Sequence, residues 1–352
     1  MGGNHHIFKN ATSVLHKRIC LSVGKEGFMK YIIDTDIGDD IDDAFAFDLA
    51  LKKDLDLVCV TTVFRNTRER AQIAKRMCAL FGVDVPVYAG YGDTLGGNVP
   101  TQGRLCQWTS ELEKYAPDNV REEEAVDAIV AAARRYGPEL TVLALGPLTN
   151  LARAIGKDAE AMRTIGGIVM MGGDFRNHYA EWNICSDAEA ADCVFSSGVP
   201  VTAFGHEVTS RMRLTREEQE YVFSMRQDTY HAYLSELSRL WYASKPAGWR
   251  MVLHDVMVVR YALDSAYCRM ACAPVAVELE GRYTRGMTVN LSKMDSYRPG
   301  DGTFVNYAAE ADAKEFIAYF MRGLGYAAKP VHTMPRERGR DQNNIRTREE
   351  IL

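Results

Sequence analysis

The chain contains no apolar stretch long enough to cross a bilayer, no block of basic residues and no cysteine spacing typical of a zinc site. A membrane-spanning helix needs about 20 consecutive apolar residues, and nucleic-acid binding needs clustered Lys and Arg. The net charge is −5, and charged residues make up 25% of the 352 positions. These absences predict a protein whose partners include neither a membrane nor a nucleic acid.

The eight cysteines are scattered along the chain, and several stand in apolar runs. In a chain of this length, such cysteines are typical of buried thiols in a reducing compartment and not of a disulfide framework. We therefore expect a cytoplasmic protein.

The chain also lacks internal repeats and any linker rich in Pro, Gly or Ser. Residues 1–28 have a polar start and only a short apolar stretch, which is unlike a signal peptide. We expect these residues to form a disordered N-terminal extension. Residues 29–330 are predicted to form a single domain, followed by a charged C-terminal tail at residues 331–352.

Apolar runs alternate with helix-like patterns through the first two thirds of this domain. The expected strands are residues 30–35, 55–64, 85–89, 140–145, 167–171 and 199–204. The expected helices between them are residues 42–53, 67–81, 122–136, 148–155 and 187–197. The strand runs are continuously apolar, which indicates a mostly parallel central sheet with helices on both faces, a Rossmann-like α/β fold. The remaining expected elements are helical insertions at 217–244 and 251–264, a β-hairpin at 274–289 and a final helix at 308–322.

Six aspartates lie within ten residues, between the first strand and the first helix: Asp34, Asp36, Asp39, Asp40, Asp42 and Asp43. Two unit charges 4 Å apart repel by about 1 kcal/mol in water and by about 4 kcal/mol at an effective dielectric of 20. A helix N-terminus offsets only ~0.3–1 kcal/mol per carboxylate. One aspartate could cap the helix, but a cap needs only one carboxylate. The cluster therefore predicts a divalent cation, and an all-oxygen site favours a hard ion such as Ca²⁺.

Other polar motifs follow the expected strands. Because ligands of parallel sheets bind beyond the carboxyl ends of the strands, these motifs should meet the aspartates there. Gly146-Pro147 would expose the Leu145 carbonyl, a possible cation ligand. Glu181 and Asn183 could bind vicinal hydroxyls or could be ordinary loop residues. His254-Asp255 is either a buried structural pair or a proton donor beside a metal ligand.

Together these motifs resemble the inosine–uridine-preferring nucleoside hydrolase family over roughly residues 30–325. The opening signature of the family, Asp-x-Asp-x-Gly followed by Asp-Asp-Ala, matches Asp34-Thr35-Asp36-Ile37-Gly38 and then Asp42-Asp43-Ala44. The later matches, in order, are Gly146-Pro147-Leu148-Thr149-Asn150, Met171-Gly172-Gly173, Glu181-Trp182-Asn183 and His254-Asp255. The aspartate loop is about two residues longer than the shortest version in the family, so we align it through Ala44.

The resemblance implies calcium-dependent hydrolysis of the N-glycosidic bond of a ribonucleoside, giving free base and ribose. Asp36 would contact the metal and act as general base on a metal-bound water. His254 would protonate the leaving base. The remaining metal ligands would be Asp43, Asp255 and the Leu145 carbonyl. The substrate-binding residues implied are Asp42, Asn66, Met171, Asn177, Glu181, Trp182, Asn183 and again Asp255.

The sequence leaves the preferred base open and does not fix the oligomeric state, for which we expect a homodimer or homotetramer. Two other functions fit parts of the pattern. A non-catalytic nucleoside- or pentose-binding protein would keep the fold without turnover. A Mg²⁺-dependent aspartyl phosphohydrolase also begins with Asp-x-Asp after its first strand, but it would leave Glu181-Trp182-Asn183 and His254-Asp255 unexplained.

Overall fold

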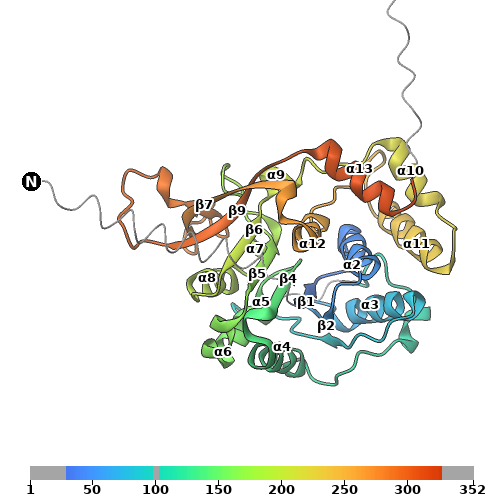
Figure 1. Cartoon of the computed structure of the whole chain (residues 1–352), viewed down its shortest axis with the longest axis horizontal. Helices are drawn as coiled ribbons and strands as arrows, with labels where there is room; N and C mark the ends of the chain where they lie inside the picture. The colour runs from blue at the N-terminus through green and yellow to red at the C-terminus, as the bar shows by residue number, and fades with distance from the viewer. Residues whose placement is uncertain (1–28, 98–102, 327–352) are drawn as a thin grey trace, which may run out of the picture.

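The computed structural model describes residues 29–97 and 103–326, and a nine-stranded sheet runs through this part of the chain (Figure 1). The strand order is β3-β2-β1-β4-β5-β6-β9-β7-β8. The strands are β1 (Lys30–Thr35), β2 (Leu57–Thr62), β3 (Val87–Ala89), β4 (Leu140–Ala144), β5 (Gly167–Met171), β6 (Val201–Phe204), β7 (Cys268–Val277), β8 (Thr288–Asn290) and β9 (Thr303–Ala311). The predicted extension at residues 1–28 and the tail at 331–352 lie outside the described residues.

The first six strands pair in parallel, and β6 also pairs in parallel with β9. Only β7 introduces antiparallel pairing, with β8 on one side and β9 on the other. Strands β1, β2, β4, β5 and β6 therefore all end at one edge of the sheet, which we call the carboxyl edge. The predicted α/β fold with a mostly parallel sheet is confirmed.

Helices cover both faces of the sheet, as the continuously apolar strands require. The Ile33 side chain on β1 belongs to a core that includes residues of α2 (Asp42–Lys52), α3 (Thr67–Phe81), α11 (Thr229–Ala243), α12 (Val256–Leu263) and α13 (Ala313–Gly323). Its neighbour Ile32 belongs to a second core, with α4 (Glu123–Tyr136), α5 (Thr149–Lys157), α6 (Ala159–Thr164) and α8 (Ala188–Ser196). Successive strand residues thus point into different cores. No helix in the described part of the chain has the length and apolarity that a membrane crossing requires.

Three predicted elements were wrong in detail. Residues 217–244 form two helices, α10 (Arg216–Ser224) and α11, because Asp228 accepts the His231 N–H and caps a new helix start. The helix expected at 251–264 begins only at Val256, which leaves His254 and Asp255 in the preceding turn. Residues 308–311 belong to β9, where they pair with β7, and the last helix begins at Ala313.

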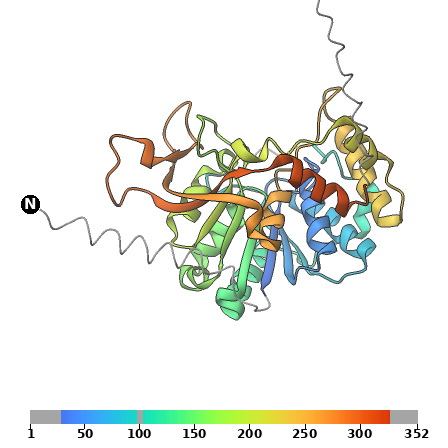
Figure 2. The same cartoon turned by 45° about the horizontal axis from the view of Figure 1, so that its top comes forward.

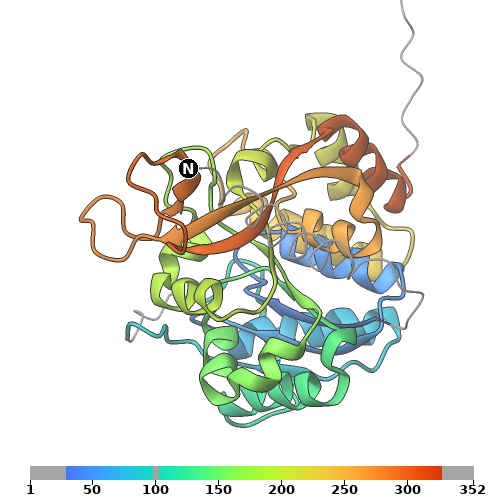
Figure 3. The same cartoon turned by 60° about the vertical axis from the view of Figure 1, so that its left-hand side comes forward.

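The hairpin predicted at 274–289 is present as the β7–β8 pair, but β7 begins earlier, at Cys268, and pairs along most of its length with β9. The segments joining β7, β8 and β9 project from the body of the molecule (Figure 2). From a second direction, the long β7 and β9 strands are seen to extend the sheet beyond β6 (Figure 3).

Candidate active site at the carboxyl edge

A cavity of about 590 Å³ opens at the carboxyl edge. It brings together most of the residues predicted from the sequence to act in catalysis or binding: Asp36, Asp42, Asp43, Leu145, Met171, Glu181, Trp182, Asn183, His254 and Asp255. Two predicted residues do not line it. Asn66 donates to the Glu69 carboxylate, and the exposed Asn177 donates to the Asp174 carboxylate.

The six clustered aspartates have different surroundings. Asp34 faces the fold interior, where its Oδ1 accepts hydrogen bonds from Thr61 Oγ1 at 2.6 Å and Asn150 Nδ2 at 2.8 Å. Asp39 pairs with Arg70 at 2.9 Å, and Asp40 lies 3.8 Å from Lys245 Nζ. Only Asp36, Asp42 and Asp43 therefore remain for chemistry deep in the cavity.

Arg70, a fully buried residue of α3, holds the aspartate loop in place. Its guanidinium donates to the backbone carbonyls of Phe64, Asp36 and Ile37 as well as to the Asp39 carboxylate. The planar fork of Arg suits such multiple acceptors. This residue was not predicted from the sequence, because an Arg in a helix with polar neighbours is normally exposed.

Asp42 and Asp43 occupy the first turn of α2, where the N-cap position, Ile41, makes no side-chain cap. Their exposed fractions are 3% each, and that of Asp255 is 4%. One carboxylate oxygen from each of the three lies within 4.8 Å of the others, and we call them the three-carboxylate cluster. The Asp255 N–H donates to Asp42 Oδ2 at 3.1 Å, and Thr35 Oγ1 donates to Asp43 Oδ1.

Burial raises the pKa of every carboxyl group in this cluster, and the neighbouring carboxylates raise those of Asp43 and Asp255 further. The pKa of Asp42 rises to about 6, and those of Asp43 and Asp255 rise well above the ordinary range. The pKa of Asp36 also rises to about 6, through burial, although Arg70 opposes the shift. Buried oxygen donors of one charge sign fit a hard divalent cation, which would remove this electrostatic penalty.

Two further oxygen donors stand beside the three-carboxylate cluster. A Cβ at Gly146 would lie 2.8 Å from Asp36 Oδ1, so the Gly146-Pro147 turn packs directly against this carboxylate. The preceding Leu145 carbonyl lines the cavity and accepts a hydrogen bond from Asn183 Nδ2 at 2.7 Å. A carbonyl oxygen has a second lone pair, so this group can also coordinate a cation.

Glu181 and Asn183 form the polar wall of the cavity. Glu181 caps the short helix α7 (Trp182–Ser186), accepting the N–H groups of Asn183 and Ile184, and also accepts that of Gly173. Burial raises the pKa of Glu181 to about 7 in spite of these bonds. Both side chains are buried, and both residues line the cavity.

Burial favours the neutral form of His254, as it does for the carboxyl groups, but for a histidine this lowers the pKa. His254 Nδ1 is hydrogen-bonded to Thr209 Oγ1 at 2.7 Å, at the end of the one-turn helix α9 (His206–Thr209). Burial lowers the pKa of His254 to about 4, so the imidazole is neutral at pH 7. With Nδ1 engaged, Nε2 is the ring nitrogen left to meet a ligand.

Asp39 and Asp40, which belong to the predicted acidic cluster but received no individual role from the sequence, also line the cavity. The other lining residues to which the sequence assigned no role are Arg65, Arg104, Cys106, Tyr179, His206, Ser244 and Lys245. The backbone conformation at Arg65 marks this residue as unusual, and only the structure reveals that conformation. Arg65 and Phe64 have positive φ angles of 59° and 68°, which are uncommon without glycine and cluster at functional sites. The Arg65 guanidinium lies 4.7 Å from the Phe64 ring centroid and 5.9 Å from that of Trp182.

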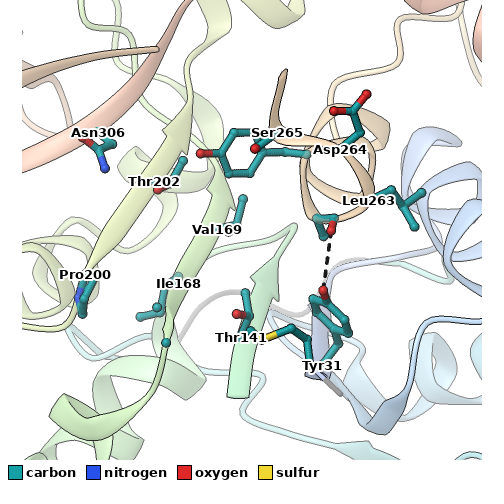
Figure 4. A pocket seen from close by; sticks show the side chains of 15 residues that line it. Tyr31, Thr141, Ile168, Val169, Pro200, Thr202, Leu263, Asp264, Ser265 and Asn306 are labelled. Carbon is teal, nitrogen blue, oxygen red and sulfur yellow. Dashed lines mark hydrogen bonds between the residues drawn. The ribbon is translucent and has the colours of Figure 1, made fainter. Parts of the chain in front are cut away.

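A second cavity, of about 380 Å³, lies near the opposite ends of β4, β5 and β6, beside the C-terminal end of α12 (Figure 4). There the Tyr31 hydroxyl donates to the Ala262 carbonyl at 3.5 Å. Its one lining carboxylate, Asp264, pairs with Arg260 at 2.8 Å. With a single, ion-paired carboxylate, the described lining of this cavity offers no cation site comparable to the three-carboxylate cluster.

Comparison with known proteins agrees with this geometry. The family model for inosine-uridine preferring nucleoside hydrolase matches residues 31–318. Probable uridine nucleosidase 2 of Arabidopsis thaliana is 30% identical over 318 residues, which cover 84% of this chain and 97% of that protein. The pyrimidine-specific ribonucleoside hydrolase RihA of Escherichia coli is 30% identical over 275 residues, 73% of this chain and 87% of RihA.

Solved structures give the same result. A plant nucleoside hydrolase superposes with a TM-score of 0.72 at 28% identity, covering 85% of this chain and 99% of that one. A purine-preferring ribonucleoside hydrolase from Gardnerella vaginalis has a TM-score of 0.69 at 27% identity, covering 84% and 98%. The chain belongs to the inosine–uridine preferring nucleoside hydrolase family, and the protein is a nucleoside hydrolase. This membership supports hydrolysis of the N-glycosidic bond of ribonucleosides.

The role of Arg70 leads to a stability prediction. In Arg70→Lys, a single ammonium replaces the guanidinium that donates to three backbone carbonyls and one carboxylate, so some of these acceptors lose their hydrogen bond. Each buried acceptor left unpaired costs about 1–3 kcal/mol. We expect the free energy of unfolding in urea to fall by at least about 2 kcal/mol. The matched control Arg68→Lys, exposed on the same helix, should change it by less than about 0.5 kcal/mol. Equal stability of the two variants would contradict the structural role of Arg70.

Proposed function

We propose that this nucleoside hydrolase uses Ca²⁺ to cleave the N-glycosidic bond of ribonucleosides, releasing free base and ribose. The observation that carries the proposal is the three-carboxylate cluster, whose oxygens lie within 4.8 Å of one another in the cavity that also holds His254 and Glu181. An acidic cluster alone is common. A buried one, facing a proton donor and a hydroxyl-binding wall, is suited to glycosidic hydrolysis.

The cation would be held by Asp36, Asp43, Asp255 and the Leu145 carbonyl. The donor set is entirely oxygen, without His or Cys, which favours Ca²⁺ over Zn²⁺. When bound, the cation supplies positive charge that lowers the pKa of water and holds vicinal hydroxyls. Asp36 then accepts the proton of the attacking water, a role suited to a carboxylate whose pKa is raised toward neutrality.

The sugar is held by Asp42, Glu181 and Asn183, together with Asp255, through its hydroxyls. Fixing the sugar in this way brings the reacting carbon next to the attacking water. C–N cleavage develops positive charge on the ribosyl ring, and the surrounding carboxylates stabilise that charge more than they stabilise the ground state. Met171 and Trp182 complete the lining. We leave Asn66 and Asn177 out of this proposal because they do not line the cavity.

His254 acts on the leaving group. A nucleobase departs poorly as an anion, so a donor to its ring nitrogen helps, typically by ~10²–10⁴-fold. Thr209 engages His254 Nδ1, so we assign donation to Nε2. The donating form is the imidazolium, which returns to the neutral imidazole favoured by burial once the base has taken the proton. The predicted cytoplasmic location and the homodimeric or homotetrameric state stay predictions.

The activity itself is tested with purified protein, Ca²⁺ and a panel of purine, pyrimidine and nicotinamide ribosides, assayed for reducing sugar. We expect ribose release from at least one member. A parallel panel of phosphate esters, assayed for inorganic phosphate, should give none. Phosphate release without ribose release, or riboside binding without turnover, would refute the proposal.

The cation assignment leads to a matched pair of variants. Asp43→Asn removes a charge from the three-carboxylate cluster, so we expect loss of bound calcium and of at least 99% of activity, because both depend on that charge. Asp54→Asn makes the same change at an exposed residue just beyond the other end of α2, and should alter neither. Elemental analysis after dialysis gives the calcium content. Full calcium occupancy in the Asp43 variant would overturn the ligand assignment.

His254→Ala should separate proton donation from metal binding. We expect calcium content to be unchanged and nucleoside turnover to fall by ~10²–10⁴-fold. Hydrolysis of 4-nitrophenyl riboside, whose leaving group departs without protonation, should be nearly retained. Steady-state kinetics on both substrates measures the difference, and an equal loss on both would exclude His254 as the proton donor.

A further inference from the structure

Three aromatic rings from distant parts of the chain stand together on one side of the cavity. The centroids of Tyr179 and His206 are 4.4 Å apart with an interplanar angle of 31°, and those of His206 and His254 are 5.8 Å apart at 17°. All three residues line the same cavity as the three-carboxylate cluster. We call them the ring wall.

The backbone around His206 fixes the position of this residue. Its N–H donates to the Gly173 carbonyl at 2.8 Å, and α9 begins with it directly after β6. The following residue, Glu207, accepts the Phe175 N–H at 3.2 Å and so ties α9 to the loop after β5, the loop that carries Tyr179. These contacts with the segments that follow β5 and β6 therefore fix the position of His206 in the ring wall.

The ring nitrogens of His206 are uncommitted. Among residues 29–97 and 103–326 no hydrogen bond involves them, whereas His254 bonds to Thr209 and His231 to Asp228. The Tyr179 ring lies tilted against one face of the His206 ring and the His254 ring lies parallel to it, so the edge of His206 is better placed than its face to meet a ligand. Burial lowers the pKa of His206, and the neutral imidazole offers one donor and one acceptor.

The chemistry of the reaction says which part of the substrate meets this edge. The leaving base must lie beside His254, because that residue protonates it. The residues proposed to hold the sugar are carboxylates and Asn183. His206 is the next ring along from His254, with centroids 5.8 Å apart, so a base that lies beside His254 also comes within reach of the His206 edge.

We propose that His206 is a specificity-determining residue that hydrogen-bonds the heteroatom edge of the nucleobase, with Tyr179 holding its ring in position. The inference rests on the proposed function and adds to it a residue that recognises the leaving group as a heterocycle. A leaving group without hydrogen-bonding ring atoms gains nothing from this contact. His206 therefore separates nucleosides from simple aryl ribosides.

The test replaces His206 with Phe, which keeps a flat ring and removes both nitrogens, and with Gln, which restores a donor and an acceptor. The matched control is His178→Phe, at an exposed residue that does not line the cavity. Each variant and the unaltered calcium-loaded protein are assayed on uridine, inosine and 4-nitrophenyl riboside. Thermal unfolding checks that each variant is folded.

We expect His206→Phe to lower kcat/KM at least tenfold on whichever nucleosides the unaltered protein cleaves, mainly through KM. The same variant should change kcat/KM for 4-nitrophenyl riboside by less than twofold. His206→Gln should recover part of the nucleoside activity, and His178→Phe should match the unaltered protein on every substrate.

Other outcomes overturn the proposal. An equal loss on nucleosides and on the aryl riboside means that His206 only supports the cavity. Unchanged kinetics on all substrates means that it does not touch the base. Failure of the unaltered protein to release ribose from any riboside would instead refute the proposed function, and this inference with it.

Discussion

Mutual repulsion among buried carboxylates is the constraint on which this active site depends. Asp42, Asp43 and Asp255 are each at most 4% exposed, and burial raises the pKa of each. A fold that keeps such groups together must either protonate them or balance their charge. Of the candidate counter-ions, Arg70 is committed to Asp39 and to three backbone carbonyls. A divalent cation is the simplest remaining source of balance.

The parallel sheet makes this concentration of charge possible. Strands β1, β4, β5 and β6 end at one edge, so short polar segments far apart in the sequence meet there without long loops. The α2 helix contributes a positive helix end at Asp42 and Asp43, and the turn before α12 contributes His254 and Asp255. The carboxylates proposed to bind the cation and sugar therefore line the same cavity as the ring wall proposed to contact the base.

The strands, their parallel pairing and the meeting of polar motifs at the carboxyl edge could be predicted from the sequence. The continuous apolar runs indicate the strands, and the position of Asp42-Asp43 at the start of a helix is also visible locally. Contacts with distant parts of the chain did not change either of these two features. The assignment of residues 308–311 to β9 could not be predicted, because it depends on pairing with the distant β7. The start of α12 after Asp255 depends likewise on the Asp255 N–H bonding to Asp42.

Parts of the site were beyond sequence analysis for the same reason. Gly205-His206-Glu207 is visible as a polar strand end, but nothing local shows that the His206 ring lies beside those of Tyr179 and His254. Arg70 shows no local sign of burial. Conversely, Asn66 and Asn177 were expected near the ligand from motif position alone, and each instead bonds to a nearby carboxylate.

Thermal unfolding as a function of pH, with calcium and with a chelator, tests the central claim most directly. The folded-state pKa values of Asp36 and Asp42, about 6, exceed the unfolded value of about 3.9, so without a cation stability is lost as pH rises through 6. Under the proposed function, calcium would bind the ionised cluster and reverse that loss. We predict a Tm that falls with pH in chelator and is higher in calcium, with a gap that widens as pH rises from about 4 through about 6. Identical Tm values in calcium and chelator across this range would contradict the account.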